Sequence, residues 1–73
     1  MRCLEEVLLG IDECEALKLV DYLGLGQEAA AEKMHVSQPT LSRILAGARK
    51  KTAEAVTQGK ALRIEGGKFE VRV

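Results

Sequence analysis

Polar side chains suited to reading DNA are concentrated between residues 37 and 50. Ser37 is a residue type that favours helix N-caps, and Pro39 is tolerated in a first helical turn, where its missing N–H costs nothing. Helical spacing then places Ser42, Arg43 and Ala46 on the face opposite Leu41, Ile44 and Leu45. This pattern predicts the second helix of a helix-turn-helix that reads duplex DNA. The candidate DNA-binding residues are Ser37, Gln38, Thr40, Ser42, Arg43, Arg49 and Lys50.

The candidate residues differ in the contact each is suited to make. Gln38 can form a bidentate contact to adenine, and Arg43 to guanine or to a backbone phosphate. Thr40 is expected to touch a phosphate or to cap the helix. The cluster of Arg49, Lys50 and Lys51 is suited to clamping phosphates, and an equally weighted alternative is a solubilising cluster with Lys51 folded against the core. A plainly solvated surface is the alternative for Gln38, Ser42 and Arg43.

The segment before Ser37 has the features of the preceding helix and its turn. Ala30 and Ala31 are small, as required where two helices cross closely. His35 occupies the corner, where a positive φ is needed, and histidine is enriched among the non-glycine residues that accept it. His35 is therefore interpreted as a turn residue rather than as a pH sensor or a ligand.

The elements around this unit predict a mainly α fold, a three-helix helix-turn-helix domain with a C-terminal two-stranded β-hairpin. Helices are expected over about 12–23, 27–34 and 37–58, and hairpin strands over about 61–65 and 68–73. A short N-terminal strand within 4–9 is a weaker expectation. The whole chain, 1–73, forms one domain, since 73 residues leave no room for a second.

The first helix is expected to begin with Asp12 as its N-cap and Glu15 completing a capping box. Its apolar stripe consists of Ala16, Leu17, Val20 and Leu23. Gly24 is expected to end it. The acidic residues Asp12, Glu13, Glu15 and Asp21 are interpreted as its water-facing side.

The third helix is longer than a DNA-reading helix needs to be. At about 1.5 Å per residue it spans about 30 Å, and only its first two turns fit a major groove. The remainder is expected to pack on the first helix or on the same helix of a second subunit. Gly47 lies inside this helix, where it permits a bend or close packing or is a tolerated surface residue, and Gly59 ends the helix.

The C-terminal segment has the alternating pattern of a hairpin. Gly66 and Gly67 form a two-residue turn signal. One face of the resulting hairpin is apolar, and the charged pairs on the other face are opposite in sign. The expected cross-strand pairs are Glu65–Lys68, Ile64–Phe69, Arg63–Glu70 and Leu62–Val71.

The net charge of zero conceals a strong asymmetry. Residues 1–36 carry three basic and eight acidic side chains (3 − 8 = −5), and residues 37–73 carry eight basic and three acidic ones (8 − 3 = +5). Such asymmetry between halves is a pointer to a nucleic-acid surface. Chance segregation of solvated charges is the alternative.

Catalysis, metal binding and membrane insertion find no support in the sequence. One histidine lacks an oriented nucleophile, and no phosphate-cradling loop is present, so no enzyme and no cofactor is expected. Cys3 and Cys14 with one histidine cannot supply a four-ligand zinc site. They are interpreted as reduced, partly buried thiols of a cytoplasmic protein, and the run Val7–Leu9 is far too short to span a membrane.

These residues resemble a family of small prokaryotic proteins of unassigned role that are predicted to bind DNA. Its helix-turn-helix is similar to the promoter-reading fourth region of bacterial sigma factors. The motifs that carry the resemblance cover nearly the whole chain; they are Glu5-Glu6-Val7, Asp12-Glu13, Glu15-Ala16-Leu17, Gln27-Glu28, Ala31-Glu32, Met34, Val36-Ser37, Pro39-Thr40, Ser42-Arg43-Ile44-Leu45, Ala48-Arg49-Lys50-Lys51 and Gly59-Lys60-Ala61-Leu62-Arg63-Ile64-Glu65-Gly66-Gly67. The resemblance implies DNA binding but no particular target.

The chain departs from the family pattern at several positions. Members usually carry a basic lead-in with cysteine and proline before the glutamate pair, and here only Met1-Arg2-Cys3-Leu4 precedes it. Where the family favours arginine, glycine and phenylalanine, this chain has Gln38, His35 and Leu41. Gln38 moves the expected base preference from guanine toward adenine.

The sequence therefore predicts a transcriptional regulator that binds double-stranded DNA as a homodimer, with half-sites about 34 Å apart. A protein-interaction or adaptor module with the same fold is the alternative, mildly favoured by the zero net charge. A redox or metal sensor acting through Cys3 and Cys14 is a third hypothesis. RNA polymerase as a partner is not supported by the spacing of the acidic residues.

Overall fold

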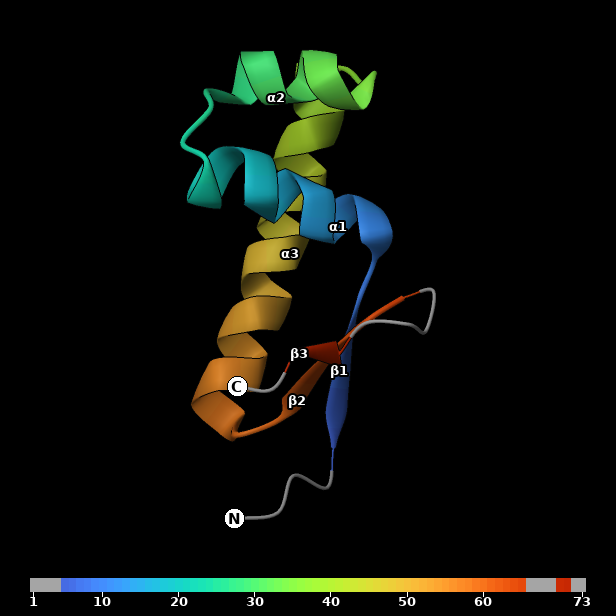
Figure 1. Cartoon of the computed structure of the whole chain (residues 1–73), viewed down its shortest axis with the longest axis vertical. Coiled ribbons are helices and arrows are strands. Elements are labelled where there is room, and N and C mark those ends of the chain that lie inside the picture. Colours follow the sequence, from blue (N-terminus) through green and yellow to red (C-terminus); the bar gives the residue numbers. More distant parts are fainter. Residues whose placement is uncertain (1–4, 66–69, 72–73) are drawn as a thin grey trace.

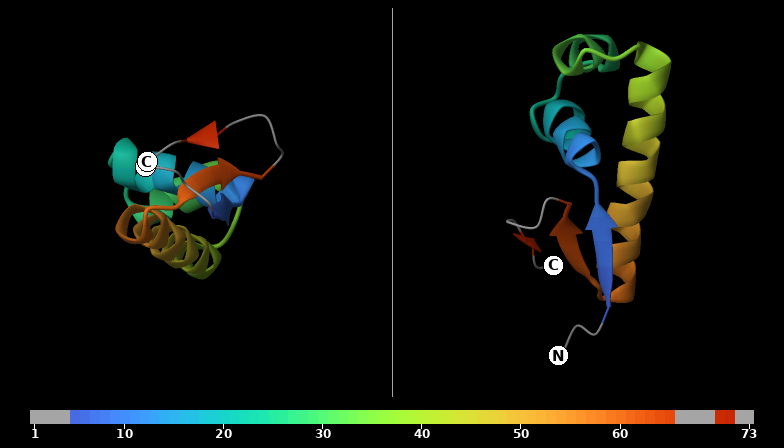
Figure 2. Two further views of the ribbon diagram at one scale, coloured as in Figure 1. Left: turned by 90° about the horizontal axis from the view of Figure 1, so that it is seen from below. Right: turned by 90° about the vertical axis from the view of Figure 1, so that its right-hand side faces the viewer.

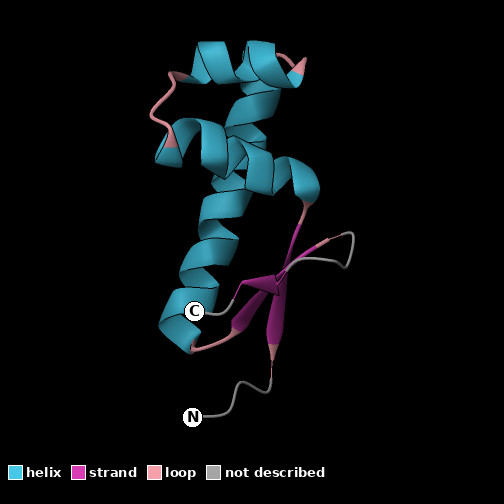
Figure 3. Cartoon of the chain, viewed as in Figure 1, coloured by secondary structure: helices cyan, strands magenta, loops and turns pink. Residues whose placement is uncertain are grey.

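The fold is organised along one long helix, α3, which runs from Gln38 to Gln58 (Figure 1). The computed structural model describes residues 5–65 and 70–71. The other described elements are β1 (Glu6–Leu9), α1 (Ile11–Ala16), η1 (Leu17–Tyr22), α2 (Gln27–Met34), β2 (Ala61–Ile64) and β3 (Glu70–Val71). The shorter helices lie beside the first half of α3 and the strands beside its second half, as Figure 3 shows. The predicted mainly α fold is confirmed.

Every other described element lies on the same side of α3 (Figure 2, right). The first half of α3 packs on α2 and on the helix formed by α1 and η1. Its core consists of six buried residues: Ala16, Leu19, Ala30, Ala31, Leu41 and Leu45. The second half of α3 packs on the sheet, where Ala55 contacts Val7 and Leu62. The length of α3 beyond the helix-turn-helix is thus used within the chain to hold the sheet and α1.

The sheet has the order β1-β2-β3. β1 runs parallel to β2 with Val7 opposite Leu62, and this confirms the weakly expected N-terminal strand. β3 is antiparallel to β2, and the predicted register is confirmed at Leu62–Val71 and Arg63–Glu70. The predicted turn at 66–67 and the pairs Ile64–Phe69 and Glu65–Lys68 lie outside the described residues.

The start of the first helix corrects the prediction that Asp12 is its N-cap. The helix begins at Ile11, and Gly10 is the capping residue with an extended backbone. Glu13, rather than Glu15, reaches back, and its Oε1 accepts a hydrogen bond of 2.8 Å from the N–H of Gly10. Asp12 instead lies in the first turn, where the helix dipole favours a carboxylate.

The second half of this helix, η1, is a π-helix and not the expected α-helix. Its bonds join residues five apart, as from the Leu23 N–H to the Lys18 carbonyl at 2.8 Å. The wider turn rotates Leu23 out of the predicted stripe, and Leu23 is 52% exposed. Leu19, which the predicted stripe omitted, is buried in the core. Gly24 then adopts φ +78°, as predicted for the glycine that ends the helix.

Candidate nucleic-acid interface

The corner between α2 and α3 has the geometry that its sequence predicted. His35 adopts φ 59° and ψ 40°, a left-handed conformation, and its side chain is exposed. The carbonyl of Ala31 accepts a 3.0 Å hydrogen bond from the N–H of Val36 across this corner. The chain therefore turns within three residues and begins α3 directly beneath α2.

Small residues allow the two helices to approach. Ala30 and Ala31 are 0% and 3% exposed, within the core that also holds Leu41 and Leu45. Met34 packs against the same core from the end of α2. The prediction that small residues are needed at this crossing is confirmed, because a longer side chain at either position would displace α3.

Ser37 is the N-cap of α3, as predicted. Its Oγ accepts a hydrogen bond of 3.3 Å from the N–H of Thr40, and its hydroxyl donates to Thr40 Oγ1 at 2.9 Å. Thr40 was expected to touch a phosphate or to cap the helix, and these hydrogen bonds give it a part in the cap. These two hydrogen bonds fix where α3 begins.

The outward face of α3 carries the other expected base-reading residues. Gln38, Ser42, Arg43 and Ala46 are all exposed. On the opposite face Leu41 and Leu45 are 0% and 1% exposed, and Ile44 is half-buried. The other described elements all lie on one side of α3, so its far side is uncovered (Figure 2, right). The amino end of the helix is thus accessible to a large ligand.

Arg49, a candidate phosphate contact, forms an ion pair with Asp21. Its guanidinium donates two hydrogen bonds to this carboxylate, from Nη2 at 2.7 Å and from Nε at 3.1 Å. Two parallel bonds make the geometry specific. Arg49 joins α3 to η1, and Asp21, predicted to be water-facing, is one of the residues that position the helix.

Lys51 lies on another flank of α3 and contacts Glu13. Its Nζ donates to Glu13 Oε1 at 2.7 Å, and the same oxygen accepts from the Gly10 N–H. Glu13 is only 14% exposed, so its interpretation as water-facing is wrong. Of the two readings of Lys51, folding against the body of the protein is the one the structure supports.

Gly47 permits this arrangement. A Cβ atom at this position would lie 3.0 Å from Oε2 of Glu13, which is closer than ordinary van der Waals contact. Of the roles considered for Gly47, close packing is the one observed. The sequence gives no local signal for this contact because Glu13 and Gly47 lie 34 residues apart along the chain (47 − 13).

Two carboxylates at this junction have lowered pKa values. Desolvation, the largest single influence, raises the pKa of Glu13, but the hydrogen bonds from Lys51 and Gly10 and the charge of Lys51 together bring it below 4.5. The hydrogen bonds from Arg49 are the main cause of the lowered pKa of Asp21. In the unfolded chain both carboxylates regain their ordinary affinity for protons.

These shifts predict how stability depends on pH. Because the folded pKa lies below the unfolded one, each group stabilises the fold fully above its ordinary pKa, and this contribution is lost as the pH falls below it. Glu13→Gln with Asp21→Asn should therefore reduce the loss of urea stability below about pH 4.5. Glu28→Gln is the matched control, since Glu28 makes no ion pair with any residue in 5–65. An unchanged acid profile in the double variant would contradict this assignment.

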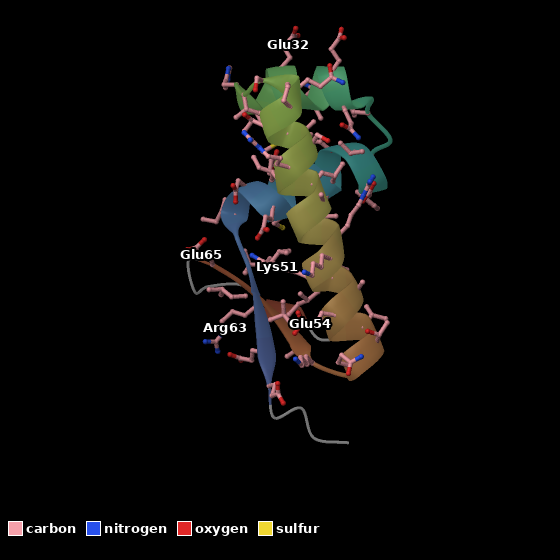
Figure 4. All side chains as sticks on the ribbon, turned by 180° about the vertical axis from the view of Figure 1, so that it is seen from behind. Glu32, Lys51, Glu54, Arg63 and Glu65 are labelled. Atoms are coloured by element: carbon pink, nitrogen blue, oxygen red, sulfur yellow. The ribbon has the colours of Figure 1, made fainter. Side chains whose placement is uncertain are left out.

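Other basic residues in the second half of the sequence also form ion pairs. Lys60 contacts Glu54 at 2.8 Å and Glu5 at 3.2 Å, and Arg63 contacts Glu6 at 3.3 Å. In Figure 4, Lys51, Glu54 and Arg63 lie in the half with the sheet, whereas Glu32 lies at the end with α2. Among the cations of α3, only Arg43 and Lys50 make no ion pair with a described residue, and both are exposed.

Neither a metal site nor a membrane-spanning helix is found among the described residues. No group of three or more histidine, cysteine or acidic residues in 5–65 is arranged to hold a metal ion. Cys14 is a half-buried free thiol, and Cys3 lies outside the described residues. None of the helices in the described part of the chain is long and apolar enough to cross a bilayer.

Comparison with known proteins identifies relatives but no activity. The family described as "Protein of unknown function DUF134" matches residues 2–72. A UPF0251 protein of Desulforudis audaxviator is 57% identical over 67 residues, covering 92% of this chain and 44% of the relative. UPF0251 proteins of Ruminiclostridium cellulolyticum and Halothermothrix orenii are 50% and 53% identical, covering 90% and 96% of this chain and 52% of each relative. The chain thus spans about half the length of these relatives, and no solved structure matches it.

Proposed function

The chain belongs to the DUF134 family of proteins of unknown function, and from its own geometry we propose that it binds double-stranded DNA sequence-specifically and regulates transcription. The observation that carries the proposal is the exposed outward face of α3, held by a corner at His35 and a cap at Ser37. An α-helix of this width enters a major groove, and its first turns then lie against base edges.

Four residues of α3 make the proposed contacts to DNA. Gln38 in the first turn makes a bidentate contact to adenine, and Arg43 one turn later contacts guanine or a phosphate. Lys50 lies two turns further along and contacts the phosphate backbone. Ser42 lies between Gln38 and Arg43 as a small polar contact. Arg49, whose side chain is 52% exposed, donates to Asp21 and in this proposal serves first to position α3.

Selection of bound sites from a random duplex pool, followed by gel shifts at increasing salt, tests the proposal. We expect a recurring site, bound at micromolar protein or below, with affinity that falls as salt rises. Gln38→Ala should relax the preference at one position of that site. An affinity that does not change with salt concentration, or the absence of binding at micromolar protein, would contradict the proposal.

The salt dependence of DNA affinity should also differ between variants of two adjacent lysines, Lys50 and Lys51. Lys50→Gln is expected to make the slope of log affinity against log salt shallower by about 0.9, the contribution of one phosphate contact. Lys51→Gln is the matched control, because Lys51 is turned about 100° around the helix and is bonded to Glu13. Equal slopes for both variants would show that Lys50 does not contact a phosphate.

We further propose that the DNA-bound form is a homodimer. Five large apolar side chains are exposed in the described part of the chain: Leu8, Ile11, Tyr22, Leu23 and Val56. Selected sites should then contain two-fold related half-sites about 34 Å apart. Single, asymmetric sites together with a monomeric mass by light scattering would contradict the dimer.

An adaptor that binds protein rather than DNA is the second candidate function. It is favoured by the internal pairing of Arg49, Lys51, Lys60 and Arg63, which leaves less positive charge available for phosphates. The salt-titrated gel shift distinguishes the two, since an adaptor shows no salt-dependent affinity for duplex DNA.

A further inference from the structure

Ala46 lies at the centre of the outward face of α3, between longer side chains. With 100° between successive residues, Ala46 projects between the directions of Gln38 and Arg43 and follows Ser42 by one turn. All four residues are exposed. The face therefore has long side chains along its margins and small ones, Ser42 and Ala46, along its midline.

This arrangement lets the helix approach the base pairs closely at its midline. Gln38 and Ala46 are eight residues apart, which is roughly 12 Å along the helix and comparable to the width of the major groove. Ala46 begins the third turn of α3 and therefore lies at the edge of the groove that Gln38 enters, where the turns that fit the groove end. A long side chain at position 46 would hold the helix away, whereas a single methyl group does not.

The chemistry of alanine restricts what this position can recognise. Its side chain has neither a hydrogen-bond donor nor an acceptor, so it cannot distinguish bases by their polar edges. The apolar feature that the major groove offers is the C5-methyl group of thymine. We propose that Ala46 is a specificity-determining residue that contacts a thymine methyl group within the bound site; this inference rests on the proposed DNA-binding function.

Replacing thymines by deoxyuridine in the selected duplex tests the assignment, because it removes the methyl group alone. At one thymine we expect about fourfold weaker binding by the unsubstituted chain, the loss that corresponds to one buried methyl group. Ala46→Gly should bind the thymine and deoxyuridine duplexes equally. Ala53→Gly, at another exposed position of α3, is the control for the lower helix propensity of glycine and should keep the fourfold preference.

The possible results separate this inference from the function on which it rests. Site-specific, salt-dependent binding that is insensitive to every deoxyuridine, or a preference that persists in Ala46→Gly, overturns the role of Ala46 alone. Absence of salt-dependent duplex binding overturns the proposed function as well. If Ala46→Gly does not fold by circular dichroism, Ala46→Ser replaces it, since serine is a better helix former than glycine and turns the apolar methyl group into a polar hydroxymethyl group. The preference for thymine should then fall, and an unchanged preference would overturn the role of Ala46.

Discussion

An Ala46→Glu variant is expected to bind duplex DNA about a hundredfold more weakly than the unsubstituted chain, or worse. A carboxylate at the centre of the outward face of α3 would meet the phosphates of the groove, and like charges juxtaposed in an interface cost several kcal/mol. Folding should not suffer, because position 46 is exposed and glutamate is a strong helix former. Gel shifts at fixed salt measure the loss, and thermal unfolding measures stability.

Ala53→Glu is the matched control for this substitution. Ala53 is also exposed, but it lies seven residues further along α3, roughly 10 Å from Ala46 and beyond the turns that fit a groove. Its effect on affinity should be several times smaller. Equal affinities for the unsubstituted chain and Ala46→Glu would mean that DNA, if bound, contacts another surface.

Leu41→Ala is expected to cause the largest loss of stability. The Leu41 side chain is completely buried between α3 and the helices that pack on it. Truncation of such a leucine costs about 2–5 kcal/mol, partly because a cavity remains. A domain of this size has a small margin, so its melting temperature should fall by roughly 10 °C or more.

Leu8→Ala provides the comparison, since Leu8 is 51% exposed on β1. This change should lower the free energy of unfolding by far less than Leu41→Ala does. Urea unfolding of both variants is the measurement. A cost below about 1 kcal/mol for Leu41→Ala would contradict the packing described for α3.

Features decided by local sequence could be predicted. The left-handed backbone at His35, the cap at Ser37 and the helix ends at Gly24 and Gly59 each depend on the residue itself and its near neighbours. The register of β2 with β3 at Leu62–Val71 followed from the alternation of apolar residues around a two-residue turn.

Features decided by distant contacts could not be predicted. Sequence pattern does not indicate which strand β1 joins, because the parallel pairing of Val7 with Leu62 brings together residues 55 positions apart (62 − 7). Nor does periodicity reveal the π-helical turn that exposes Leu23, since it assumes 3.6 residues per turn.

The candidate interface also combines features that local sequence predicts with features that depend on distant contacts. Exposure of Gln38, Ser42 and Arg43 followed from helical spacing. The commitment of Arg49 to Asp21 did not, since 28 residues separate them. Part of the charge asymmetry between residues 1–36 and 37–73 serves to hold α1 and η1 against α3 through Glu13 and Asp21.

Titration of isotope-labelled protein with a mixed-sequence duplex at low salt, followed by heteronuclear NMR, tests most directly whether the outward face of α3 contacts DNA. The account predicts that the largest shifts occur at the side chain of Gln38, the backbone of Ser42 and Arg43, and the methyl group of Ala46. Resonances of β1 and β2 should change little, and added salt should reverse the effect. Shifts confined to the sheet, or no shifts at millimolar duplex, would contradict it.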